Sequence, residues 1–228
     1  MAKREAVGFS HRLPSLKVRN SLTTELLNHL KTVHHEALYH VVSHWSTPAS
    51  SYPRSTEGEW SISERVQLPG TYSMQNPGDF YYHPQPITLT VLKEGAKVWF
   101  TDEPRQMYAL AEIGLFRAHG YVVVGGLGLG LIHSFLRNNT NVKKVLTIER
   151  AVELQKLVWP YARSGDLVIG DFYEWLPYLA KAGGPVDTII TDFIFGEQGQ
   201  DTWAELQRQR KFCASLFPKA TFLEHGYQ

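Results

Sequence analysis

The stretch VVVGGLGLGLIHSFL, residues 122–136, places four glycines in six positions between an apolar run and an amphipathic segment. A run of β-branched residues is typical of a buried strand, and the apolar spacing after the glycines is typical of a helix. Glycine at such a turn allows a sharp bend and lets a ligand approach the backbone and the helix N-terminus. The stretch therefore predicts a strand–turn–helix unit with a binding site at its turn.

After residue 120, short apolar runs alternate regularly with amphipathic segments. This alternation predicts a parallel sheet with helices on both faces, in which ligands bind beyond the carboxyl ends of the strands. The expected fold is α/β, a Rossmann-like sheet preceded by an N-terminal helix and β-hairpin. The expected strands cover residues 121–125, 145–149, 167–169, 186–191 and 220–224, and the expected helices cover residues 129–138, 151–162, 173–182 and 202–217.

The first part of the chain has a different texture, with fewer regular segments. We therefore expect an N-terminal extension over residues 1–103 and a Rossmann-like domain over residues 104–228. Pro104 is a helix-opening signal, and apolar residues carry that helix towards Gly120. The elements expected in the extension are a helix over residues 21–45, a long connection or partly mobile lid over 46–78, and a hairpin of strands over 87–92 and 96–101.

The spacing of the glycines separates two classes of cofactor. A dinucleotide fingerprint, G-x-G-x-x-G, would need glycine at position 131 or 133, and these positions hold Leu131 and His133. The sequence instead has Gly126, Gly128 and Gly130 at every second position. This G-x-G-x-G form resembles motif I of the class I S-adenosylmethionine-dependent methyltransferases, and the order of elements resembles their Rossmann-like domain.

Acidic residues close the next strands in the order that this family shows. Glu149 ends the second strand, 23 residues after Gly126, where a carboxylate can accept both hydroxyls of a ribose. The resemblance implies that Asp171 and Phe172, after the third strand, contact adenine. It also implies that Asp192, after the fourth strand, lies where the reactive end of the site begins. Each position also has a structural explanation, since Glu149 and Asp171 could cap the helices that follow them.

The segment before the glycine loop narrows the resemblance. A β-hairpin followed by TDEPRQMYALAEI looks like the arrangement in spermidine synthases and their methyltransferase-like relatives. The residues after Asp192, FIFGEQGQ, lack the serine- and proline-bearing pattern of aminopropyltransferases and the Pro-Pro-aromatic pattern of base-modifying amino-methyltransferases. The two C-terminal strands usual in methyltransferases have no counterpart after residue 224, so we expect a reduced sheet or an edge covered by the hairpin.

Methyl transfer needs little from the protein besides orientation of the acceptor, because the sulfonium is already activated. A base is needed only where the acceptor must lose a proton. Asp192, Glu197 and His225 follow the ends of expected strands and could reach the cleft, and Asp192 is preferred for orienting the acceptor or removing its proton. An ordinary loop carboxylate is the alternative for Asp192.

Composition excludes several partners. The formal net charge is +1 with no block of like charge, which argues against nucleic acid, and no apolar run is long enough to span a bilayer. We expect a cytoplasmic protein in which Cys213, the single cysteine, is buried and structural. His40 and His44 lie one turn apart in the expected first helix, but no third ligand follows from the spacing, so no metal site is predicted.

Three hypotheses follow from these residues. The first is an S-adenosylmethionine-dependent methyltransferase with a small-molecule or protein acceptor. The second is an enzyme that uses another part of the same cofactor, such as the aminopropyl arm. The third is a non-catalytic Rossmann-like binding module. The apolar stripe of the expected first helix makes a homodimer a further expectation.

Overall fold

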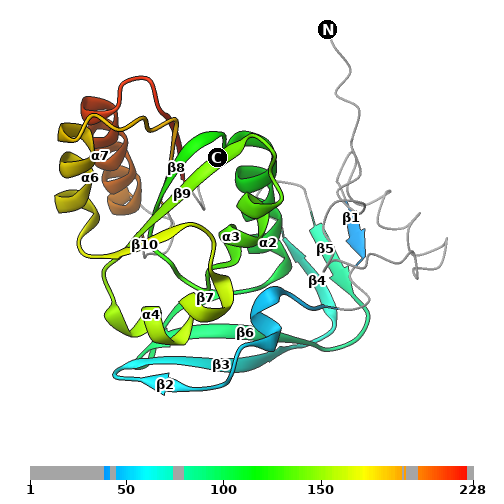
Figure 1. Cartoon of the computed structure of the whole chain (residues 1–228). Coiled ribbons are helices and arrows are strands. Elements are labelled where there is room, and N and C mark those ends of the chain that lie inside the picture. The colour runs from blue at the N-terminus through cyan, green and yellow to red at the C-terminus, as the bar shows by residue number, and fades with distance from the viewer. Residues whose placement is uncertain (1–38, 42–44, 74–79, 192, 194–199, 225–228) are drawn as a thin grey trace, which may run out of the picture.

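The computed structural model describes residues 39–41, 45–73, 80–191, 193 and 200–224. These residues form three β-sheets, and helices pack on both faces of the largest sheet (Figure 1). The largest sheet contains β8 (Gly120–Gly125), β9 (Val142–Glu149), β10 (Asp166–Ile169), β11 (Thr188–Thr191) and β12 (Thr221–Glu224).

The five strands are all parallel and lie in the order β10-β9-β8-β11-β12. The first strand of the unit, β8, is central, and the chain order reverses beside it. This is the Rossmann-like arrangement predicted from the sequence, and the predicted strands overlap the observed ones with ends that differ by at most three residues. Open α/β sheets bind ligands at such a reversal, which here lies at the carboxyl end of β8, where the glycine loop begins.

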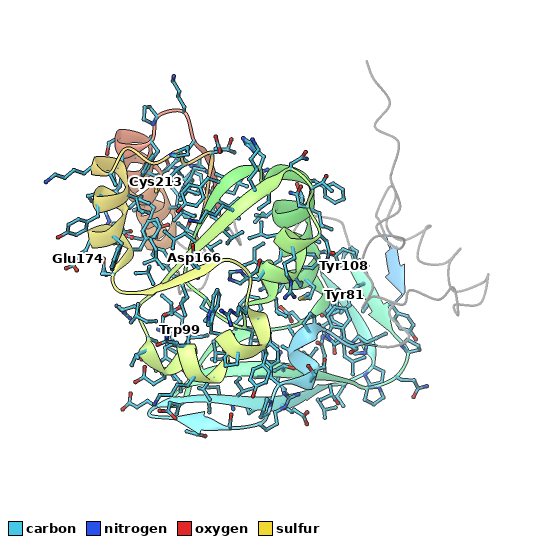
Figure 2. The ribbon with its side chains drawn as sticks, in the orientation of Figure 1. Tyr81, Trp99, Tyr108, Asp166, Glu174 and Cys213 are labelled. Atoms are coloured by element: carbon cyan, nitrogen blue, oxygen red, sulfur yellow. The ribbon has the colours of Figure 1, made fainter. Side chains whose placement is uncertain are left out.

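Two hydrophobic clusters cover the two faces of this sheet. Val122 and Val124 face one cluster, whereas Val123 between them faces the other, as the alternation of side chains along a strand requires. Cys213, on α7, is buried in the second cluster as expected (Figure 2), and burial raises the pKa of its thiol to about 12. The helices of this half are α2 (Pro104–Ala111), which continues as the π-helical η3 (Glu112–Arg117), α3 (Leu131–Arg137), α4 (Val152–Leu157), α5 (Trp159–Ala162), α6 (Phe172–Lys181) and α7 (Gln200–Leu216).

A second sheet corrects the expectation of a long connection or lid over residues 46–78. This segment instead contains η2 (Pro48–Ser51), β2 (Thr56–Glu57), β3 (Trp60–Gln67) and β4 (Gly70–Ser73). β3 pairs along its whole length with β6 (Ile87–Glu94), so long-range pairing stabilises a sequence with weak local signals. The predicted hairpin of β6 and β7 (Lys97–Thr101) is confirmed. It extends this second sheet in the order β2-β3-β6-β7 and does not pair with β12, the edge strand of the largest sheet that the hairpin might have covered.

A small third sheet corrects the end of the predicted first helix. Tyr39–Val41 forms β1, which runs parallel to β5 (Phe80–His83), and β4 completes the sheet. The β-branched and aromatic residues of this segment suit a strand. Trp45, the last residue of the predicted helix, is not helical either, and its Nε1 donates a hydrogen bond to the Asp102 carbonyl at 2.8 Å. Residues 21–38 and 42–44, which carry His44 and most of the apolar stripe proposed for dimerisation, lie outside the described residues.

The N-terminal strands pack against the Rossmann-like half through a shared core. The hydroxyl of Tyr52 donates to the Leu129 carbonyl in the glycine loop at 3.2 Å. Buried Asp102 accepts hydrogen bonds from the Thr47 hydroxyl at 2.5 Å and from the Thr90 backbone N–H at 2.6 Å, which joins η2 to β6. Ala49, Tyr52, Ile62 and Leu92 of the extension belong to the same cluster as Val122 and Ile190 of the sheet. The domain boundary at residues 103 and 104 stays a prediction.

A buried histidine follows the glycine loop and makes the stability dependent on pH. His133 has no exposed surface. Its pKa falls to about 4 from an ordinary value of 6.5, mainly because burial disfavours the charged imidazolium. Between these values the unfolded chain binds a proton that the folded protein does not, so the free energy of unfolding should fall as pH falls from 6.5 to 4. Urea unfolding at pH 7 and pH 4.5 gives the free energy of unfolding at each pH. Between the two, His133→Gln should lose about 2 kcal/mol less of this free energy than the wild type does. Equal losses in both proteins would contradict this assignment.

Candidate functional site

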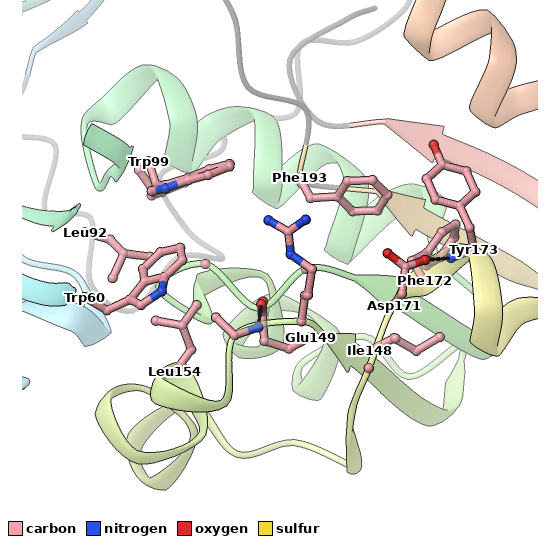
Figure 3. A pocket seen from close by; sticks show the side chains of 16 residues that line it. Trp60, Leu92, Trp99, Ile148, Glu149, Leu154, Asp171, Phe172, Tyr173 and Phe193 are labelled. Atoms are coloured by element: carbon pink, nitrogen blue, oxygen red, sulfur yellow. Dashed lines mark hydrogen bonds between the residues drawn. The ribbon is translucent and has the colours of Figure 1, made fainter. Parts of the chain in front are cut away.

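A cavity of about 280 Å³ lies at the carboxyl ends of β8, β9 and β10. Figure 3 shows Trp60, Leu92 and Trp99 on one side, Asp171 and the two aromatic residues after it on the other, and Glu149 between them. The volume lies near the lower end of the range of roughly 300–1,000 Å³ that is typical of small-molecule sites. Strand ends far apart in the sequence therefore meet around one cavity.

The glycine loop contributes two of its predicted residues to this cavity. Gly126 and Gly128 line it and have φ angles of 87° and 52°, which L-residues with side chains rarely adopt. Gly130 is not among the lining residues. It is the N-cap of α3, where a Cβ would lie 2.2 Å from the Cβ of Ala162 on α5. The third glycine of the motif thus allows close helix packing, whereas the first two lie where a ligand can approach.

Glu149 holds the glycine loop in place. Its Oε2 accepts a hydrogen bond from the Leu127 backbone N–H at 2.6 Å, and its Oε1 accepts one from the Ala151 N–H at 2.7 Å. Burial raises the pKa of this carboxyl, and the two N–H donors oppose that rise. A carboxylate has about four lone-pair sites, so these two hydrogen bonds leave acceptor capacity for a ligand. Glu149 does not cap α4, because the N-cap of α4 is Ala151 and no side chain makes a capping hydrogen bond there. The Glu149 side chain does border the cavity.

Asp171 and Phe172 also have a structural role while bordering the cavity. Asp171 is the N-cap of α6, and its Oδ1 accepts hydrogen bonds from the Tyr173 N–H at 2.7 Å and the Glu174 N–H at 3.3 Å. Both of these hydrogen bonds end on Oδ1, so neither uses Oδ2. The ring of Phe172 packs 5.2 Å from that of Phe193, and both rings line the cavity.

The residue preferred for catalysis cannot be placed in the same way. Asp192, Glu197 and His225 lie outside the described residues. Their neighbours Thr191, at the end of β11, and Phe193, in the cavity wall, are described. The role of Asp192 stays a prediction.

The wall that the extension contributes to the cavity was not predicted from the sequence. Trp60, Leu92, Trp99 and Phe100 line the cavity from β3, β6 and β7. The alternation in WSISERVQ was the available signal for β3. Nothing in this stretch indicates that Trp60, its first residue, lines the same cavity as the glycine loop, which is more than sixty residues later in the chain. Long-range pairing of strands creates this wall.

Charge is confined to one part of the cavity. Among the described lining residues, the acidic and basic side chains are those of Glu149, Arg150 and Asp171, which follow β9 and β10. Tyr173 also lines the cavity, but burial and its hydrogen bond to Glu205 raise the pKa of its phenol to about 12, so it stays protonated. In the part of the chain that is described, no three His, Cys, Asp or Glu side chains are grouped to hold a metal ion, and no helix could cross a membrane.

The comparisons with known proteins concern the fold. No family model and no curated protein matches the sequence. Among solved structures, spermidine synthase from Thermotoga maritima matches with a TM-score of 0.40 and 16% identity over 67% of this chain and 54% of that chain. A spermidine synthase in complex with the transition-state analogue AdoDATO matches with a TM-score of 0.37 and 18% identity over 60% of this chain and 49% of that chain. The chain spans about half the length of these proteins.

Proposed function

We propose that this chain binds S-adenosylmethionine in the cavity and transfers its methyl group to an acceptor. One observation carries the proposal: Gly126, Gly128, Glu149, Asp171 and Phe172 border a single cavity at the point where the strand order reverses. Such a point is where open α/β sheets bind ligands, and a glycine loop beside a helix N-terminus suits a ligand that approaches the backbone.

The contacts suggest an orientation for the nucleoside. The free lone pairs of Glu149 suit the two ribose hydroxyls, and the backbone of Gly126 and Gly128 suits the amino-acid tail. Oδ2 of Asp171 is placed to accept from the adenine amino group, while the ring of Phe172 offers an apolar face to the base.

The reaction we propose is a direct displacement. A nucleophilic atom of the acceptor attacks the methyl carbon, the bond between carbon and sulfur breaks, and S-adenosylhomocysteine leaves as a neutral thioether. A proton released by the acceptor would pass to a base, for which Asp192 remains the preferred residue. The positive sulfonium would also be favoured beside the faces of aromatic rings in the cavity.

A calorimetric titration tests the cofactor directly. We expect the purified chain to bind S-adenosylmethionine and S-adenosylhomocysteine, and to bind NAD far more weakly, because the loop lacks the third glycine of a dinucleotide fingerprint. Binding of NAD alone, or of no nucleoside, would overturn the proposed function.

Aminopropyl transfer is the second candidate. The antiparallel sheet of β2, β3, β6 and β7 ahead of the Rossmann-like half matches the hairpin arrangement by which the sequence resembles spermidine synthases. The two reactions leave different products, namely S-adenosylhomocysteine for methyl transfer and methylthioadenosine for aminopropyl transfer from the decarboxylated cofactor. Chromatography of the nucleoside product separates them, and a binding module without activity would form neither.

A further inference from the structure

One end of the cavity is lined by aromatic and aliphatic side chains. Its residues are Trp60 from β3, Leu92 from β6, Trp99 and Phe100 from β7, and Leu154 from α4; we call them the tryptophan end. None of these five side chains is ionisable, and the charged residues that line the cavity follow β9 and β10 instead. This end therefore offers dispersion and stacking rather than a charge partner.

A β-bulge explains how two neighbouring residues reach the same cavity. Phe100 pairs with Leu92, and Val98 pairs with Lys93, so Trp99 is an extra residue between the two pairs. In a regular strand, Trp99 and Phe100 would point to opposite faces of the sheet. A bulge re-aims side chains and often lies beside a functional site. Both residues line the cavity here, which is what the bulge achieves.

The indole of Trp99 is held by several contacts. Its Nε1 donates to Oε2 of Glu94 at 2.8 Å, and the Lys97 ammonium lies 3.8 Å from the centre of a ring. The Trp60 ring stacks on Trp99 with 5.8 Å between centroids and an angle of 27° between planes. Because these contacts already restrict the rings, a ligand that packs against them loses little additional side-chain entropy.

The tryptophan end lies where the reacting group of a bound nucleoside would be. In Figure 3, Glu149 separates Asp171 and Phe172 from Trp60 and Trp99. The base and the 5′ substituent of a nucleoside leave its ribose on opposite sides. With the ribose at Glu149 and the base towards Asp171, the 5′ sulfur therefore points towards the tryptophan end.

We infer that the tryptophan end binds the acceptor, and that the acceptor is a flat, uncharged aromatic small molecule. This inference rests on the proposed function and deepens it. An aromatic ring gains stacking energy from Trp60 and Trp99. A polyamine finds no carboxylate among the five lining side chains of this end, and the neighbouring Glu94 does not line the cavity and already accepts a hydrogen bond from Trp99. In the reaction, a nucleophilic atom of the acceptor bonds to the methyl carbon, the bond between this carbon and sulfur breaks, and S-adenosylhomocysteine leaves. A proton that the acceptor loses passes to solvent water.

The test uses the full chain saturated with S-adenosylhomocysteine, whose affinity is first measured by calorimetry. 2-Naphthol is the aromatic probe and putrescine is the polyamine probe, and saturation-transfer NMR measures the binding of each. We expect 2-naphthol to bind together with the nucleoside and putrescine to give no signal. Trp60→Leu should weaken 2-naphthol binding about tenfold and leave the affinity for S-adenosylhomocysteine within about twofold.

A matched variant controls for the loss of a tryptophan. Trp203 is 52% exposed on α7 and does not line the cavity, so Trp203→Leu should leave the binding of both ligands unchanged. Competition between 2-naphthol and the nucleoside, failure of 2-naphthol to bind, equal binding in Trp60→Leu, or binding of putrescine would each overturn the inference. Failure of the wild-type chain to bind S-adenosylhomocysteine would instead overturn the proposed function, and the inference with it.

Discussion

Replacing Glu149 with alanine should weaken S-adenosylmethionine binding by about 100-fold. A hydrogen bond to a charged group contributes about 1.5–3 kcal/mol, and in the proposed mode of binding the carboxylate accepts one from each ribose hydroxyl. The same replacement removes the acceptors of the Leu127 and Ala151 N–H groups, which hold the glycine loop and the start of α4. Ligand contacts and the geometry of the loop are thus lost together, and calorimetry on the purified variant measures the total.

Two further variants separate these contributions. Glu149→Gln keeps the volume but turns an NH₂ group towards one of the two backbone donors, so it should lower affinity less than alanine does. Glu174→Ala removes an exposed carboxylate from the first turn of α6 outside the cavity, and it should bind as the wild type does. If Glu149→Ala melts as the wild type does and binds with unchanged affinity, the ribose does not lie at Glu149.

The Rossmann-like half was predictable because its signals are local. Each strand is a short apolar run, each helix has its own amphipathic spacing, and the glycines mark a turn that requires positive φ. The order of these elements then limits the topology, because parallel crossovers are right-handed and short. These signals therefore predict that one edge of the sheet brings together Gly126, Gly128 and the residues that close β9 and β10.

The extension was harder to predict because pairing across the chain stabilises it. β3 has charged and polar residues, including Glu64 and Arg65, and acquires its structure by pairing with β6 more than twenty residues later. The tryptophan end depends on this pairing and on the bulge at Trp99, neither of which has a signature in the sequence. The sequence alone therefore does not predict the aromatic wall of the cavity.

Gly130 belongs to the glycine motif but does not line the cavity. Its place in the G-x-G-x-G pattern indicates contact with a cofactor, yet the residue faces α5 and not the cavity. The pattern records a requirement for glycine and does not distinguish the approach of a ligand from the approach of a helix. The contact between the position of a Gly130 Cβ and Ala162 shows that a helix, and not a ligand, requires glycine here.

Gly130→Ala should lower the free energy of unfolding by about 3 kcal/mol. A φ of +67° costs an alanine roughly 1–2 kcal/mol, and a Cβ placed 2.2 Å from Ala162 adds an overpacking cost of about 1–3 kcal/mol. Gly183 has a φ of +69°, and a Cβ added there would meet no atom within 4 Å, so Gly183→Ala isolates the backbone cost. That variant should lose only about 1 kcal/mol. Thermal unfolding should show a shift on the order of 10 °C for Gly130→Ala and about 3 °C for Gly183→Ala. Equal shifts would mean that α3 and α5 move apart without cost, and the close packing assigned to Gly130 would then be wrong.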